Sequence, residues 1–180
     1  DNEGNIAVIA AGTGLGEAGL AWADGHYVAV PSEGGHASFA PGTELEGELW
    51  RWLFERHGHV SWERVVSGMG LVNIYEFLRD DRGAGDADVE PDWLRDRLAE
   101  QGARARIISS AAREEGVPLA KEALSLFVSL YGAEAGNLAL EMLATGGVYI
   151  GGGIAPQIIS ELTDGAFMDA FSEKGRVSDV

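Results

Sequence analysis

Two short strings near the start of the chain combine groups that bind phosphate with groups that bind sugar hydroxyls. The first, GTGLG at residues 12–16, follows an apolar run. Such a turn brings backbone N–H groups close to phosphate oxygens, because glycine has no Cβ. The second, EGGH at residues 33–36, offers a carboxylate that accepts from two neighbouring hydroxyls and an imidazole that donates or accepts. Together these strings indicate a sugar kinase whose ligands occupy one crevice.

The GTGLG string fits neither of the two common nucleotide-binding motifs. A dinucleotide fingerprint needs G-x-G-x-x-G at the start of a helix, whereas the residues that follow have a strand-turn-strand pattern. No Lys-Ser/Thr pair follows the glycines, which excludes a Walker A loop. Two interpretations remain open. The string is either a phosphate-binding hairpin, with the Thr13 hydroxyl and flanking amides as donors, or an ordinary glycine-rich turn.

The other candidate residues also have plain structural interpretations. His36 alone is more often a structural histidine, and one His with one Glu is too few ligands for a metal site. Glu63 lies at the start of an expected helix, where it either complements the helix dipole or faces the same cleft as EGGH. The glycines at 151–153 form either a tight strand-to-helix turn or a bare surface for a base or ribose.

Strands followed by helices are expected to position these strings. Runs rich in Val, Ile, Ala and Tyr predict strands at 5–10, 17–23 and 26–30, and Asp24-Gly25 predicts a hairpin, which gives a three-stranded antiparallel meander. Helical periodicity predicts helices over 44–57, 62–67 (with Ser61 as N-cap and Gly68 as the end), 71–79, 91–103, 105–115, 119–143 and 155–162; a buried strand at 148–150 and a solvated loop at 80–88 complete the pattern. This order indicates a layered α/β fold. Gly132 and Gly136 predict close packing of the long helix against a neighbour.

Composition excludes several classes of partner. The chain has 180 residues, which fits one domain or two small lobes. It has no cysteine, which excludes disulfides and thiolate metal sites and suits the cytoplasm. With 13 Lys and Arg against 29 Asp and Glu, the net charge of −16 repels nucleic acid and anionic membranes. Gly and Glu interrupt the apolar runs, so no membrane span is expected. The chain begins without Met and is expected to be part of a longer protein.

Five strings, taken in order, resemble the bacterial-type ATP-dependent glucokinase family: GTGLG, P-x-EGGH-x-x-FAP, GHVSWERVVSGMGLVNIY, GNLAL and GGVYIGGGIAP. The resemblance extends from about residue 6 to 176. It implies a ribonuclease-H-like lobe of the actin/hexokinase type, here a single C-terminal lobe over residues 1–180 with a helical subregion at 44–117.

The resemblance also implies ligands and the residues that hold them. The ligands are glucose and ATP, with Mg²⁺ carried by ATP. Glucose hydroxyls would be held by Glu33, His36 and Glu63, with Asn73 as a weaker neighbour. The ATP phosphates and adenosine would lie against the two glycine turns, made of Gly12, Thr13, Gly14, Leu15, Gly16, Gly151, Gly152 and Gly153.

The chain departs from the family pattern in one respect that concerns catalysis. The family carries an Asn-Asp pair, whose Asp deprotonates the 6-hydroxyl, and a D-x-GGT phosphate loop in an N-terminal lobe. Neither occurs in these 180 residues, and the last strand and helix of the family's lobe are not found before Val180. We therefore expect no catalytic residue here and almost no activity from the isolated chain. A sugar-sensing regulator and a kinase for another hexose stay open as alternatives, and a homodimer through this lobe is a further expectation.

Overall fold

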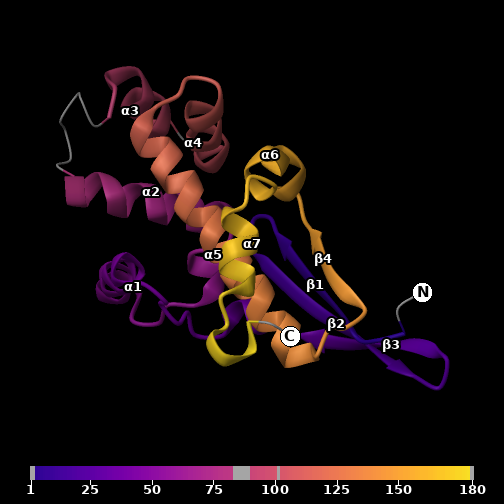
Figure 1. Ribbon diagram of the computed structural model, residues 1–180. Coiled ribbons are helices and arrows are strands. Elements are labelled where there is room, and N and C mark those ends of the chain that lie inside the picture. The colour runs from indigo at the N-terminus through magenta and orange to yellow at the C-terminus, as the bar shows by residue number, and fades with distance from the viewer. Residues whose placement is uncertain (1–2, 83–89, 101, 179–180) are drawn as a thin grey trace. The chain divides into compact units, whose positions relative to one another are not determined.

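The chain divides into two compact units, and each is described by itself. The computed structural model describes residues 3–82, 90–100 and 102–178 (Figure 1). The sheet unit comprises residues 1–37 and 128–180, and the helical unit comprises residues 38–127.

The sheet unit is built on a mixed sheet. Its strands are β1 (Ile6–Ala11), β2 (Leu15–Ala23), β3 (His26–Ser32) and β4 (Gly147–Gly151), in the order β3-β2-β1-β4. β2 is antiparallel to both β1 and β3, whereas β1 and β4 are parallel. Asp24 and Gly25 have φ angles of 50° and 80°, as a two-residue hairpin turn requires, so the hairpin expected at this dipeptide is confirmed.

β4 is more exposed than the sequence indicates. The apolar run at 148–150 predicts a buried strand, but β4 pairs only with β1 among the described strands, and Tyr149 is 57% exposed. The prediction of a strand is correct and the prediction of its burial is wrong. An edge strand has a neighbour on one side only, so apolar composition overstates its burial.

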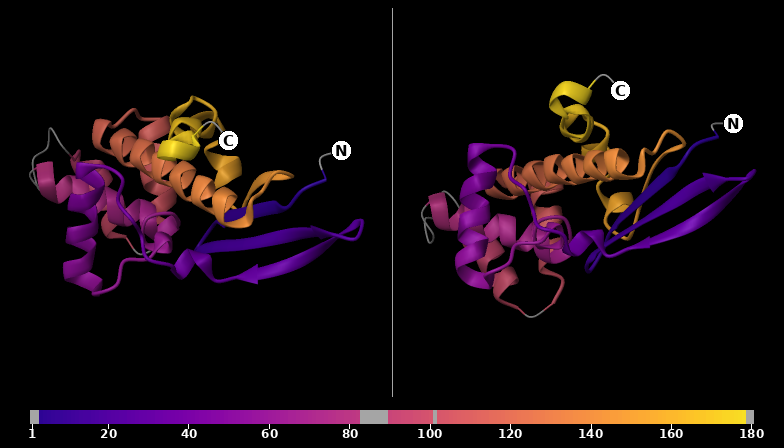
Figure 2. Two further views of the ribbon diagram at one scale, coloured as in Figure 1. Left: turned by 60° about the horizontal axis from the view of Figure 1, so that its bottom comes forward. Right: turned by 90° about the horizontal axis from the view of Figure 1, so that it is seen from below.

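The second half of α5 (Pro118–Met142) covers one face of the sheet (Figure 2). Gly19 of β2 packs against Met142, where a Cβ would overlap the methionine side chain. A Cβ on Gly132 or Gly136 would overlap backbone carbonyl oxygens of α7 (Ala166–Ser172), which confirms the close packing expected for both glycines. By length and composition α5 could cross a membrane, but most of its apolar window is buried within the protein, as in a core helix.

The segment after β4 forms less helix than expected. The sequence predicts a helix over 155–162, but the structure has a 3-10 turn at Ala155–Gln157 and a short α6 at Ile159–Leu162. Ile158 separates them with a φ of −124° and a ψ of 30°. Its side chain is 2% exposed, so burial of this residue accompanies the break in the helix.

The helical unit contains α1 (Glu44–His57), α2 (Gly68–Arg82), α3 (Asp92–Ala99), α4 (Arg104–Arg113) and the first part of α5. The bounds of α1 agree with the sequence. Thr43 Oγ1 accepts a hydrogen bond from the Glu46 amide at 3.2 Å, and Gly58 ends the helix with a φ of 74°. The core of this unit consists of apolar side chains on the inward faces of the helices, among them Leu49, Leu53, Ile74, Leu78, Leu94 and Ile108.

The helix expected between Ser61 and Gly68 is absent, and the capping residue is a different serine. Trp62–Arg64 forms one 3-10 turn, and the Ser61 side chain caps nothing. Ser67 Oγ accepts a hydrogen bond from the Gly70 amide at 3.0 Å, which makes Ser67 the N-cap of α2. Gly68 therefore begins a helix rather than closing one. α2 continues to Arg82, into the loop expected at 80–88; residues 83–89 lie outside the described part.

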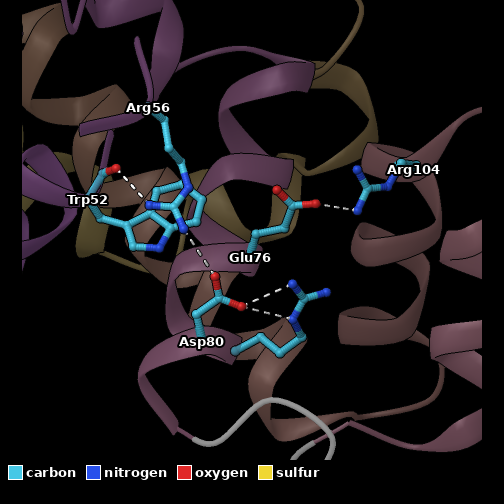
Figure 3. Close-up of polar contacts among 6 residues, drawn as sticks. Trp52, Arg56, Glu76, Asp80 and Arg104 are labelled. Carbon is cyan, nitrogen blue, oxygen red and sulfur yellow. Dashed lines mark hydrogen bonds and ion pairs between the residues drawn. The ribbon is translucent and has the colours of Figure 1, made fainter. Parts of the chain in front are cut away.

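Two acids on α2 of the helical unit are paired with arginines (Figure 3). Asp80 forms ion pairs with Arg56 at 3.5 Å and Arg79 at 3.0 Å, and Glu76 pairs with Arg104 at 2.6 Å. The Arg56 guanidinium also lies 3.5 Å from the centre of the Trp52 ring. These contacts join α1, α2 and α4 along the surface of this unit.

Candidate active site

Three loops with glycines leave the same end of the sheet (Figure 1). β1 and β4 are parallel and end at Ala11 and Gly151, so the loops that follow them start side by side. β2 begins at Leu15 and Ser32 of β3 pairs with Glu17, which brings the loop after β3 to this end as well. These loops are the GTG turn (residues 12–14), the triple-glycine turn (151–153) and the E-G-G-H turn (33–36). Loops at the carboxyl ends of strands are the usual ligand-binding edge of an α/β sheet.

The GTG turn is open to solvent. The Gly12 amide donates to the Gly14 carbonyl at 2.8 Å, which closes the turn. Thr13 is exposed, and a Cβ built on Gly12 would meet no atom within 4 Å. The Leu15 side chain is only 7% exposed, so this residue can meet a ligand only through its backbone. A turn with a free hydroxyl and unobstructed glycines can receive an anion.

The triple-glycine turn packs against the end of β1. Gly152 has a φ of 83°, and a Cβ there would overlap the Ala11 carbonyl oxygen. The same oxygen accepts a hydrogen bond from the Ile154 amide at 3.2 Å. Gly153, by contrast, has open space around it. Gly152 is therefore required by the backbone, while Gly153 leaves a bare surface beside the GTG turn.

The E-G-G-H turn is a single 3-10 turn seated on the start of β2. A Cβ on Gly35 would overlap the Leu15 carbonyl oxygen, and one on Gly34 would overlap the Glu17 carboxylate. These two glycines hold the turn against the strand, and the side chains on either side of them, Glu33 and His36, are exposed. The structure thus brings the E-G-G-H turn and the GTGLG string together at the contact between Gly35 and Leu15.

Tyr131, which the sequence analysis missed, ties two of these loops together. The Ala11 amide donates to its Oη at 3.2 Å, and this hydroxyl lies 3.3 Å from the Gly151 carbonyl oxygen and 3.5 Å from that of Ile9. Tyr131 is fully buried, and burial raises the pKa of its hydroxyl, which stays protonated. It therefore accepts from the end of β1 and donates to one of the two carbonyls. Its place on the apolar stripe of a helix hides this role in the sequence.

Glu63 and Asn73 belong to the helical unit. Glu63 lies in the Trp62–Arg64 turn, and its carbonyl accepts a hydrogen bond from Ser67 Oγ at 2.7 Å. Asn73 is 9% exposed and donates through Nδ2 to the Arg64 carbonyl at 2.9 Å, which holds the turn against α2. The grouping of these two residues with Glu33 and His36 around one sugar stays a prediction.

The donor set of the site suits anions rather than cations. The GTG and triple-glycine turns contain no acidic residue, and over residues 3–82, 90–100 and 102–178 no cluster of three His, Asp or Glu side chains could hold a metal. A cavity of about 480 Å³ elsewhere in the sheet unit is lined by residues of α5, β4 and α7 and by their flanking segments. None of the predicted site residues lines it.

The family model, the sequence relative and the solved structure described next are all glucokinases. The glucokinase family model matches residues 1–180. A glucokinase of Nostoc punctiforme is 44% identical over 96% of this chain and 53% of its own length. The crystal structure of a glucokinase from an Antarctic psychrotroph superposes with a TM-score of 0.82 at 34% identity, covering 99% of this chain and 51% of that one.

A more distant structure shares the fold. It is a ROK family glucokinase from Streptomyces griseus in complex with glucose and AMPPNP, with a TM-score of 0.63 at 23% identity over 96% of this chain and 51% of that one. The chain spans about half the length of the relatives it matches. On its sequence matches along the whole length, it belongs to the glucokinase family.

Proposed function

We propose that the complete protein transfers the γ-phosphoryl group of ATP to the 6-hydroxyl of glucose, and that this chain holds both substrates. The observation that carries the proposal is the gathering of three glycine-bearing turns at one end of the sheet, with Glu33 and His36 exposed on one of them. Family membership supports the reaction, and the glucose and AMPPNP bound by the Streptomyces griseus protein support the pair of ligands. The sheet unit would be a ribonuclease-H-like lobe of the actin/hexokinase type, working in the cytoplasm at the entry of glucose into glycolysis.

Phosphate is held by local donors in this proposal. A net charge of −16 cannot attract ATP, so the amides of the GTGLG string and the Thr13 hydroxyl must bind the phosphate oxygens by hydrogen bonds. Mg²⁺ would travel on the ATP phosphates, because the GTG and triple-glycine turns offer no carboxylate. Adenosine would lie against Gly153, where the backbone is bare. Catalysis of phosphoryl transfer is mostly positioning and charge stabilisation, which is the part this chain would contribute.

The sugar would be held by acids and an imidazole. Glu33 would accept hydrogen bonds from two hydroxyls, with His36, Glu63 and Asn73 as neighbours. Within the helical unit, Ser38 forms a β-bridge with Ser61, and these residues stand two positions from His36 and Glu63 in sequence. The base that deprotonates the 6-hydroxyl would come from outside this chain, so closure around the substrates would matter.

Calorimetric titration of the complete protein with glucose tests this proposal. Glu33→Gln removes charge-assisted hydrogen bonds that are each worth about 1.5–3 kcal/mol, so glucose affinity should fall by roughly tenfold to a hundredfold. Glu48→Gln, an exposed acid on α1, is the matched control and should bind like the wild type. Unchanged affinity in Glu33→Gln would refute the sugar role of the E-G-G-H turn.

A coupled ATP and glucose assay on the same protein separates the alternatives. Formation of ADP with glucose supports the kinase. Tight glucose binding without ADP formation would refute it and favour a sugar-sensing regulator, and a preference for another hexose would change the substrate while keeping the reaction.

A further inference from the structure

Two carboxyl groups are buried directly behind the E-G-G-H turn. Glu17 of β2 is 7% exposed and Glu134 of α5 is 5% exposed, and their side chains are in hydrogen-bonding contact. The Glu17 Oε2 atom lies against Gly34, which is the reason that a Cβ there would not fit. Its other oxygen, Oε1, is buried and finds no donor in the part of the chain that the structure describes. The seat of the turn is therefore a carboxyl group whose own partner is a second carboxyl group.

A chain of hydrogen bonds leads from this pair to the end of the sheet unit. Asn137 Nδ2 donates to Glu134 Oε2 at 2.9 Å. Lys174 Nζ donates to Asn137 Oδ1 at 2.9 Å and to the Ala133 carbonyl at 2.8 Å. Of the two carboxyl groups, Glu17 is the one with a buried oxygen, Oε1, that has no partner among the described residues.

One shared proton accounts for the contact between the two carboxyl groups. Two ionised carboxylates in contact in a buried site repel each other strongly, so one of them holds a proton at neutral pH. Burial raises the pKa of Glu134 to about 8, and it also raises the pKa of Glu17. A protonated Glu134 donates to Glu17, which leaves the Glu17 carboxylate charged and fixed beneath Gly34.

We propose that Glu17 and Glu134 share a proton that positions the E-G-G-H turn for glucose, and that loss of this proton loosens the turn. When both carboxylates are ionised, their repulsion moves Glu17 away from Gly34, and Glu33 and His36 lose their fixed placement. Both acids act through the turn and are positioning residues. The inference rests on the proposed function, since it assigns the turn to glucose.

Other charges face the pair, and they act in opposite directions. Glu141 on the same helix adds negative charge and opposes ionisation of both acids. Lys174, in the segment after α7, is held by Asn137 and offsets part of the repulsion, and the neighbouring Glu173 raises the pKa of Lys174, which favours its charged form. Within β2 itself, Glu17 is the ionisable residue. The balance among these groups sets the pH at which the turn loosens.

The test is the glucose dissociation constant of the complete protein, measured by calorimetry from pH 6 to pH 9 in wild type, Glu134→Gln and Glu141→Gln. One pH unit above a pKa of about 8, roughly one molecule in ten keeps the proton, so the wild-type dissociation constant should rise by up to about tenfold at pH 9. Glu134→Gln donates the same hydrogen bond through its carboxamide and does not titrate, so its affinity should stay level from pH 7 to pH 9. Glu141→Gln, at an exposed neighbour, keeps the carboxyl pair and removes one nearby negative charge, so the rise in its dissociation constant should have the wild-type size and begin at lower pH.

A second readout does not require glucose. Infrared spectra of the wild type at pH 7 should contain the carbonyl band of a buried protonated carboxyl, and Glu134→Gln should lack it. Absence of the band in the wild type, or an equal pH dependence of glucose affinity in wild type and Glu134→Gln, would overturn the inference while leaving the proposed function intact. Failure of the wild type to bind glucose at any pH would instead overturn the proposed function, and the inference with it, even if the band shows that the carboxyl pair exists.

Discussion

The sheet unit and the helical unit place their carboxyl groups in opposite ways. In the helical unit, Asp80 and Glu76 are partly exposed and each pairs with arginine (Figure 3). In the sheet unit, Glu17 and Glu134 are buried and face each other. Exposed ion pairs contribute little to stability, whereas an unneutralised buried acid is costly. The contrast places a contact between two buried carboxyl groups directly behind the proposed sugar turn.

The helical unit buries the acids Glu46 and Glu90, and Glu90 has a partner that is not a second acid. Glu90 is 2% exposed and accepts a hydrogen bond from the Tyr75 hydroxyl at 2.8 Å. Tyr75 is a neutral donor that loses no proton near neutral pH, because burial raises its pKa further. Glu17 instead accepts from Glu134, a donor whose raised pKa lets it titrate, so the surroundings of Glu17 respond to pH.

The largest expected effect concerns the backbone that carries the turns. Gly152→Ala places a Cβ on the Ala11 carbonyl oxygen at a φ of 83°, and this should lower the free energy of unfolding by about 2–4 kcal/mol. Gly153→Ala, with open space around it, is the matched control and should change stability by less than about 0.5 kcal/mol. Urea unfolding measures both, and equal losses would contradict the packing of the triple-glycine turn.

The next effect is the pH dependence of stability that arises from the carboxyl pair of the sheet unit. Glu134 has a raised pKa, so the stability that its proton supplies is fully present below about pH 4.5 and is lost as the pH rises towards 8. We expect the wild type to lose about 1–3 kcal/mol between pH 5 and pH 8, and Glu134→Gln to lose much less. Lys174, whose pKa burial lowers, acts with the opposite sign at more alkaline pH. Thermal unfolding at several pH values measures this, and parallel curves for the two proteins would contradict it.

A smaller effect concerns the link between β1 and β4. Tyr131→Phe removes the acceptor of the buried Ala11 amide and should cost about 1–2 kcal/mol, because that donor is left without a partner. Tyr149→Phe, on the exposed face of β4, is the matched control and should be neutral. Nucleotide affinity should also fall in Tyr131→Phe, since the GTG and triple-glycine turns both lie next to the lost hydroxyl. Stability equal to the wild type would show that the hydroxyl does not tie the strands.

The smallest effect concerns the surface of the helical unit. Asp80→Asn breaks exposed ion pairs with Arg56 and Arg79 and should change the free energy of unfolding by less than about 1 kcal/mol, with no change in glucose affinity. Its effect should shrink further in high salt. A loss larger than that of Tyr131→Phe would contradict the comparison between the units.

Much of the fold could be predicted from short-range sequence signals. The hairpin at Asp24-Gly25 and the helix between Thr43 and Gly58 follow from residues that fix backbone angles or cap a helix. The Ser61 prediction was wrong, because the serine that caps a helix here is Ser67, whose Oγ accepts from the Gly70 amide at the start of α2. The burial of residues 148–150 was overestimated because the sequence of one strand does not show its position in the sheet, and β4 lies at the edge.

Part of the candidate site could be predicted from the sequence, and part could not. The glycine strings and their flanking side chains could be found by type and spacing. The carboxyl pair could not, because it depends on the packing of β2 against α5. A signal was nevertheless present: Glu134 interrupts the apolar stripe of α5 between Tyr131 and Leu138, and Glu17 shares the inward phase of Leu15.

Hydrogen exchange of the complete protein, with and without each ligand, tests the central claim most directly. Glucose should protect the amides of residues 33–37 and the turn at Trp62–Arg64, and AMPPNP should protect residues 12–16 and 151–154. Protection of these segments by the two ligands is the result that the account predicts. Protection confined to the cavity lined by α5, β4 and α7, with the three turns unchanged, would contradict it.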